Sequence, residues 1–233
     1  MNFKPSSNPV NHSVIATISP ERFGSYLKAA GHDKVVAFEL YVWNAHMSEA
    51  FYTPLQAAEI ALRNRIDICL RTNFGEHWWR SEAFLLLIAA DKRRAIRTVE
   101  KRVLKRELPL VTAQIVAGLS FGFWIEVLKP HFAIVSWNET FCEIFPHVPG
   151  GESQETLLEK VISVVELRNR ISHHEPIFQR DLSKDYATVM TLLKWMCPST
   201  HDWIKPHCRV PAVLRQKPKP RPSSRRTETA RHP

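Results

Sequence analysis

The sequence predicts an all-α protein from its glycine content, its lack of strand patterns and its apolar spacing. The 233 residues include only seven glycines, and the alternation of apolar and polar positions that is typical of strands is scarce. From about Pro20 onward, apolar residues recur mainly at spacings of three, four and seven, as on a helix with one buried face. Several antiparallel helices around one core would form a bundle.

The first helix has clear start and stop signals. Ser19 followed by Pro20 is typical of an N-cap with proline in the first helical position, and Gly31 is expected to end this helix. Apolar repeats then predict two longer helices, over about 33–51 and 54–72.

The rest of the chain is predicted to contain a basic helix, three short helices separated by glycine or proline, and two longer ones. They cover about 81–107, 111–118, 121–129, 138–145, 154–174 and 184–196. We therefore expect one domain over 18–208, with loose segments at 1–17 and 209–233.

The positive charge is concentrated in the C-terminal segment. Residues 209–233 hold eight Lys or Arg and one Glu, which is +7 of the net charge of +9. This segment is rich in Pro, Ser and Arg, a composition that favours disorder. It either adds nonspecific affinity for RNA or DNA or acts as a solubilising extension.

Composition places the chain among globular proteins, with 44% hydrophobic and 24% charged residues. No membrane span or signal peptide is predicted, because no apolar run is long enough. The four cysteines are widely scattered without a C-x-x-C pair, which favours free thiols in a reducing compartment. We therefore expect a cytoplasmic protein without contact to a membrane.

The pentapeptide LRNRI occurs at 62–66 and 167–171, and only the second copy runs into histidines. Helical spacing puts Arg168, Asn169 and His173 on the apolar stripe of the helix that holds the second copy. Burying such polar or charged groups in a core or interface costs free energy unless they have hydrogen-bond or ion-pair partners. Together they can bind a phosphate, stabilise its charge and transfer a proton near neutral pH. The alternative is structural: Arg168 pairs with a buried Glu, and His173 is a hydrogen-bonded core residue.

The first copy has no histidine after it. Glu59 lies four residues before Arg63, so the two side chains can form an internal ion pair. The alternative is that Arg63 or Asn64 reaches the same cleft as Arg168.

Five stretches in order resemble the Abi-like proteins of bacterial abortive-infection systems, members of the HEPN superfamily. They are LYVWNAHMSEAFYTPLQAAEIALRNRI (40–66), FGEHWW (74–79), GLSFGFW (118–124), LRNRISHHEPIF (167–178) and WMCPSTHDWI (195–204). The resemblance implies a HEPN-like antiparallel helical bundle with additional helices. It also implies a homodimer whose active cleft lies at the interface.

The superfamily signature is an Arg, a polar residue and a His after a short spacer, which maps onto Arg168, Asn169 and His173. The resemblance implies a metal-independent endoribonuclease of a phage-defence or toxin–antitoxin system, which leaves a 2′,3′-cyclic phosphate. His173 would transfer the proton, with His174 as the alternative; Arg168 would stabilise charge and Asn169 would orient. An antitoxin or small RNA is an expected partner. The alternative on the same fold is a noncatalytic module that binds RNA or another protein.

The basic segment 91–107 holds eight basic and three acidic residues. Arg93, Arg94, Arg97 and Lys101 are expected to face outward, where they either contact an RNA backbone or form a solvated surface. No cofactor is predicted. No metal site is predicted either, because adjacent histidines on a helix point about 100° apart and cannot easily share an ion.

Overall fold

The computed structural model describes residues 12–129 and 143–219. The described residues contain helices and no strands, which confirms the all-α prediction. The chain divides into two compact units, one formed by Met1–Met47 and Ala212–Pro233 and the other by Ser48–Pro211. The boundaries predicted at residues 18 and 208 do not coincide with these units.

The first unit contains α1 (His12–Ile18), α2 (Pro20–Ala29) and the beginning of α3 (Lys34–Phe74). The Ser19 side chain caps α2 by accepting a hydrogen bond from the Arg22 amide, as predicted. Gly31 has a φ of 62° at the end of α2, a left-handed conformation that glycine adopts without strain. Both end signals of this helix are therefore confirmed.

Aromatic rings hold α2 against the start of α3. The ring centroids of Phe23 and Phe38 lie 4.4 Å apart, and those of Tyr26 and Tyr41 lie 5.1 Å apart. The Trp43 indole donates a 2.8 Å hydrogen bond to the Val213 carbonyl.

Two segments predicted to be loose are partly helical. Helix α1 falls within 1–17 for most of its length, and α12 (Val210–Leu214) falls within 209–233. Val210 and Val213 are buried, and burial of these two apolar side chains stabilises the helix. The polar composition of the segment as a whole does not predict it. The rest of the C-terminal segment, from residue 220, lies outside the described residues.

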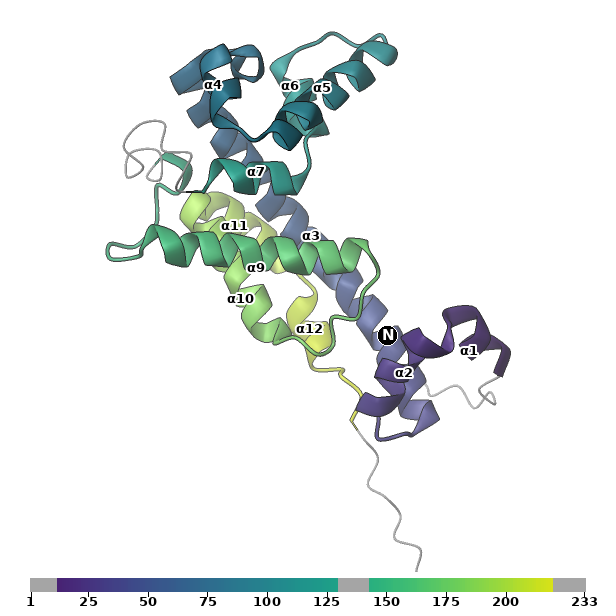
Figure 1. Cartoon of the computed structure of the whole chain (residues 1–233). Helices are drawn as coiled ribbons and strands as arrows, with labels where there is room; N and C mark the ends of the chain where they lie inside the picture. Colours follow the sequence, from purple (N-terminus) through teal and green to yellow (C-terminus); the bar gives the residue numbers. More distant parts are fainter. Residues whose placement is uncertain (1–11, 130–142, 220–233) are drawn as a thin grey trace, which may run out of the picture. The chain divides into compact units, whose positions relative to one another are not determined.

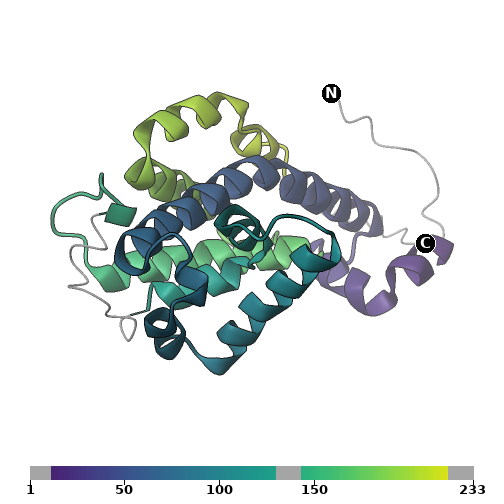
Figure 2. The same cartoon turned by 90° about the horizontal axis from the view of Figure 1, so that it is seen from above.

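The second unit continues α3 and adds the remaining helices (Figures 1 and 2). Their bounds are η1 (Trp78–Arg80), α4 (Glu82–Leu87), α5 (Ala90–Lys105), α6 (Thr112–Gly118), α7 (Phe121–Val127), α9 (Gln154–Ser172), α10 (Leu182–Met196), α11 (Pro198–Ile204) and η3 (Lys205–His207). The prediction for 138–145 lies mostly outside the described residues. Within this unit, α9 packs against α7 and α10.

The predicted break before Pro54 is wrong, because α3 runs through it. Phe51, Leu55, Ala58 and Leu62 are all buried at helical spacing on both sides of the proline. A proline inside a helix costs about 3 kcal/mol through its missing N–H and its clash with the preceding turn. Continuous burial of this row offsets that cost.

The predicted helix over 81–107 is instead two helices, α4 and α5. Ile88 and Ala89 have extended backbone between them, and the Ile88 side chain is buried. The Arg93 guanidinium donates to the carbonyls of Leu85 and Ile88 at 2.9 and 2.7 Å. Those two bonds satisfy carbonyls that the break leaves without helical partners.

Aromatic side chains from η1, α4 and α7 form a cluster in the core. The Trp78 ring contacts Phe84 and Trp124 edge-on, at centroid distances of 5.0 and 6.1 Å. Its indole N–H donates to Asp67 Oδ1 at 2.7 Å, and Asp67 Oδ2 accepts from Arg71 Nε at 2.8 Å. The two tryptophans of FGEHWW and the three aromatic residues of GLSFGFW are therefore packed in the core.

Candidate functional site

The C-terminal end of α9 positions the two histidines. The Glu175 amide donates to the Arg170 carbonyl at 2.8 Å, and the His174 amide donates to the Ile171 carbonyl at 3.1 Å. This pair of bonds is a Schellman motif, which closes a helix with one residue in the left-handed conformation. His174 is that residue, with a φ of 55°, and His173 is the C-cap.

The last turn of α9 leaves the core. Leu167 is buried, but the side chains of Asn169, His173 and His174 are exposed within the chain. The expectation that His173 could be a hydrogen-bonded core residue is therefore wrong. The expectation that Asn169 and His173 face an interface concerns a second chain and stays a prediction.

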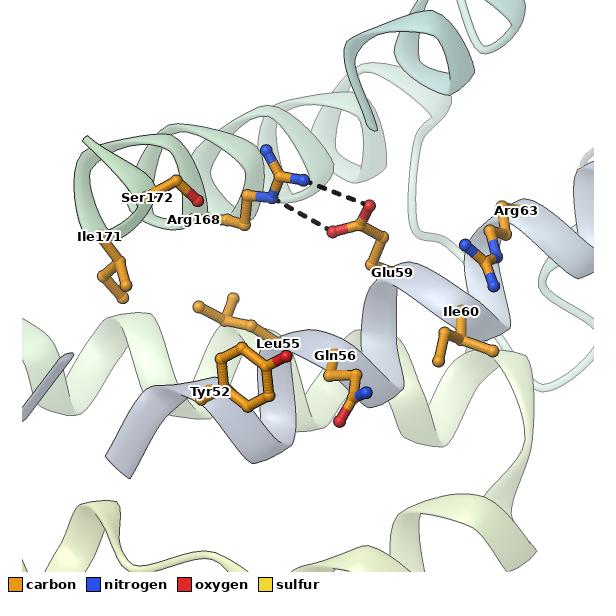
Figure 3. Close-up of a pocket in the computed structure, with 9 residues that line it drawn as sticks. All are labelled: Tyr52, Leu55, Gln56, Glu59, Ile60, Arg63, Arg168, Ile171 and Ser172. Atoms are coloured by element: carbon orange, nitrogen blue, oxygen red, sulfur yellow. Dashed lines mark hydrogen bonds and ion pairs between the residues drawn. The ribbon is translucent and has the colours of Figure 1, made fainter. Parts of the chain in front are cut away.

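Arg168 joins α9 to α3 through an ion pair. Its Nε lies 3.2 Å from Glu59 Oε2, and its Nη2 lies 3.5 Å from Glu59 Oε1 (Figure 3). A third nitrogen, Nη1, donates to Asn169 Oδ1 at 3.2 Å. Arg168 and Glu59 are both partly exposed, so water competes with this pair and limits its contribution to stability.

A pocket of about 340 Å³ opens beside this ion pair. Its lining comes from one face of α3 and from the end of α9 (Figure 3). The lining residues are Tyr52, Leu55, Gln56, Glu59, Ile60, Arg63, Arg168, Ile171 and Ser172. The lining contains two guanidinium groups and one carboxylate among apolar and uncharged polar side chains, so the pocket has an excess of positive charge.

Arg63 lines the same pocket as Arg168. Its Nε atom is buried and has no hydrogen-bond partner among the described residues. The carboxylate that sequence spacing offered to Arg63, Glu59, contacts Arg168 instead. A buried N–H donor without a partner is costly.

The two LRNRI copies are used in the same way. The first arginine of each, Arg63 and Arg168, lines the pocket, while the asparagine that follows each of them is exposed. The second arginine of each copy has a structural contact: Arg65 donates to the Met196 carbonyl at 2.9 Å, and Arg170 Nε lies 3.9 Å from a Glu175 carboxylate oxygen. The repeat therefore brings two arginines from distant parts of the sequence to one place.

The basic surface of α5 differs from the prediction at one residue. The prediction that Arg93 faces outward is wrong, because its side chain is half-buried and donates to two carbonyls at the α4–α5 break. Arg94, Arg97 and Lys101 are exposed on successive turns, as expected.

Reversing the charge of Arg94 and Lys101 together tests this surface. If α5 contacts an RNA backbone, the double change to Glu should lower RNA affinity and reduce the slope of log affinity against log salt by about one for each lost contact. Fluorescence anisotropy across a salt series measures both quantities. The matched control reverses Lys194 and Lys205, two exposed lysines of the same unit. Equal slopes for wild type and both double variants would exclude α5 as a contact.

The cysteine thiols differ in their surroundings. A hydrogen bond with the Thr200 hydroxyl, helped by backbone amides of Thr200 and Ser199, lowers the pKa of Cys197. Burial raises the pKa of Cys69 to about 12, and burial also raises the pKa of Cys208.

Among the three cysteines that the structure describes, Cys197 should consequently react first with iodoacetamide near neutral pH, because the thiolate is the nucleophile. Peptide mapping by mass spectrometry after brief labelling compares Cys197 with Cys69 and Cys208. Labelling of Cys69 before Cys197 would contradict the assigned surroundings.

Within residues 12–129 and 143–219, no three His, Cys, Asp or Glu side chains are grouped so that they could hold a metal ion. The same residues contain no helix with both the length and the apolar character needed to cross a membrane. No family model, curated protein or solved structure matches this chain.

Proposed function

We propose that the protein is a metal-independent endoribonuclease of the Abi-like, HEPN kind, with a HEPN-like helical bundle. The observation that carries the proposal is the meeting of Arg63 and Arg168 in one pocket beside the exposed histidines at the end of α9. Arginine binds phosphate through paired N–H groups, and histidine transfers protons near neutral pH. These two chemistries are sufficient for RNA cleavage by an internal nucleophile.

In the proposed reaction, a ribose 2′-OH attacks the adjacent phosphorus. His173, or His174 in its place, accepts the hydroxyl proton, and a protonated imidazole returns a proton to the departing 5′-oxygen. The products are a 2′,3′-cyclic phosphate and a 5′-hydroxyl. Arg168 stabilises the charge that develops on the phosphoryl oxygens, where fixed positive groups have their largest effect.

Asn169 supports the orientation of Arg168. Its side-chain oxygen accepts a hydrogen bond from Nη1, so the amide restricts rotation of the guanidinium. The Nε and Nη2 atoms face Glu59. A bound phosphate would replace Glu59 at this edge of the guanidinium, because both groups present paired oxygens.

The proposed active unit is a homodimer. His173 and His174 are exposed and do not line the pocket, whereas the neighbouring Ile171 and Ser172 do. A second copy facing this end of α9 would bring its own histidines toward the pocket. The resemblance further supports a role in phage defence, with an antitoxin or small RNA as a partner.

A noncatalytic module that binds RNA or another protein is the second candidate, and one observation favours it. The Arg168–Glu59 pair connects α9 to α3. In this account Arg168 is structural, and its loss should have the same consequences as loss of Glu59.

Cleavage of end-labelled total RNA in EDTA separates the two candidates. Arg168→Ala and Glu59→Gln both break the ion pair, but only the first removes the guanidinium. If Arg168 stabilises the transition state, Arg168→Ala should lose at least tenfold more activity than Glu59→Gln. Equal losses would assign Arg168 a structural role. RNA binding by the wild type without cleavage would favour the noncatalytic module.

A further inference from the structure

An exposed aromatic side chain lies at the edge of the pocket. Tyr52 is 65% exposed, although it belongs to a helix whose opposite face is buried in the core. Along α3, Tyr52, Gln56, Ile60 and Arg63 follow one another at helical spacing, so they share one face. Figure 3 shows this row along the pocket, with Arg168 and Ile171 on the facing helix.

This row carries an aromatic ring, an apolar side chain and one cation, and Arg168 adds a second cation from the facing helix. Proteins bind single-stranded nucleic acid by combining aromatic stacking platforms with positive groups along the backbone. In this pocket Tyr52 supplies the ring, Ile60 and Ile171 supply apolar surface, and Arg63 and Arg168 supply the positive charge.

We infer that Tyr52 forms a nucleobase subsite for single-stranded RNA, next to the phosphate site at Arg63 and Arg168. The inference rests on the proposed RNA substrate. A base stacked on the Tyr52 ring would cover its exposed face, and the Gln56 amide can both donate to and accept from the edge of a base. The Arg63 guanidinium lines the same pocket and supplies positive charge for the adjoining phosphate.

The spacing along α3 fits neighbouring subsites. Tyr52 and Glu59 are seven residues apart, which corresponds to about 10 Å along a helix axis. The phosphate edge of Arg168 lies beside Glu59, so the stacked base and the bound phosphate occupy separate places on one strand. The cavity of about 340 Å³ lies at the small end of the range for ligand pockets.

The subsite selects single strands over duplexes. Bases within an RNA duplex are already stacked and paired, whereas bases of loops and single strands are free to stack on aromatic side chains. Cleavage in single-stranded regions would follow from this preference.

A non-cleavable probe tests the subsite independently of the nuclease proposal. A short fluorescent oligonucleotide with 2′-O-methyl groups throughout has no 2′-OH nucleophile, so binding is measured without turnover. A second oligonucleotide of equal length and charge carries no bases. Anisotropy titrations in EDTA give affinities for both probes.

Tyr52→Leu should lower affinity for the base-bearing probe by about 5- to 140-fold, the range expected for one stacked base. Tyr52→Phe should keep the wild-type affinity, because the ring remains. Neither change should alter affinity for the abasic probe. Trp203→Leu is the matched control, since Trp203 is 67% exposed and does not line the pocket.

Three results would overturn the subsite: no binding of the base-bearing probe by wild type, no loss with Tyr52→Leu, or an equal loss on both probes. A changed molecular mass for Tyr52→Leu in light scattering would instead assign Tyr52 to a contact between copies. Cleavage of unmodified RNA is assayed separately on the same proteins. Cleavage without base-dependent binding rejects the subsite alone, and base-dependent binding without cleavage rejects the nuclease alone.

Discussion

Replacing His173 with Ala should lower the rate of RNA cleavage by about 10²- to 10⁴-fold, the usual contribution of a positioned acid or base. The imidazole is exposed and its backbone is at the C-cap of α9, with φ of −93° and ψ of 9°. Alanine adopts this conformation, so stability should change by less than about 0.5 kcal/mol. Initial rates on a defined RNA, together with urea unfolding, measure the two effects.

The comparison with His174 requires a different substitution. His174 has a φ of 55°, where alanine is strained and asparagine is tolerated. His174→Asn therefore removes the imidazole while preserving the end of the helix. The matched control is His207→Ala, another exposed histidine of the same unit. If His174→Asn loses tenfold or more of the cleavage activity while His173→Ala remains active, His174 is the residue that transfers the proton. Equal cleavage activity in all three variants would show that neither histidine takes part in the reaction.

Replacing Trp78 with Ala should cost about 3–5 kcal/mol of unfolding free energy, the usual cost for a large buried aromatic side chain. Trp78 is 0% exposed and contacts three other aromatic rings. Its removal also takes the indole donor from Asp67, a carboxylate that is itself buried. Urea unfolding followed by far-UV circular dichroism measures the loss without relying on tryptophan emission.

Two further variants test this assignment. Trp78→Phe keeps a smaller aromatic ring but removes the donor to Asp67 and part of the packed surface, so it should cost less than Trp78→Ala, about 1–3 kcal/mol. Trp203→Ala is the exposed counterpart and should change stability by less than about 0.5 kcal/mol. Equal midpoints for Trp78→Ala and Trp203→Ala would contradict the assigned core.

Helix content and strong end signals could be predicted because they depend on neighbouring residues. Ser19, Pro20 and Gly31 define α2 through local hydrogen bonds and backbone preferences. The continuation of α3 through Pro54 and the break at Ile88 could not be predicted in this way. Both depend on which side chains the rest of the fold buries, and that burial is decided by distant residues.

In the candidate site, too, neighbouring residues predict some features and distant residues decide others. Spacing along the helix predicts Glu59 as a neighbour of Arg63, but in the structure Glu59 pairs with Arg168, which lies 109 residues away in the sequence. Helical rows also placed Asn169 and His173 on an apolar stripe, whereas α9 leaves the core before it reaches them. A periodic pattern shows which side chains share a face. It does not show where the elements that cover that face end.

The chemistry of the product ends tests the central claim most directly. Wild-type protein is incubated in EDTA with a defined single-stranded RNA and with the same RNA carrying 2′-O-methyl groups throughout, and the fragments are analysed by mass spectrometry. Attack by the 2′-OH predicts cleavage of the unmodified RNA only, with 2′,3′-cyclic phosphate and 5′-hydroxyl ends. Fragments with 3′-hydroxyl and 5′-phosphate ends, or cleavage of the methylated RNA, would contradict the claim.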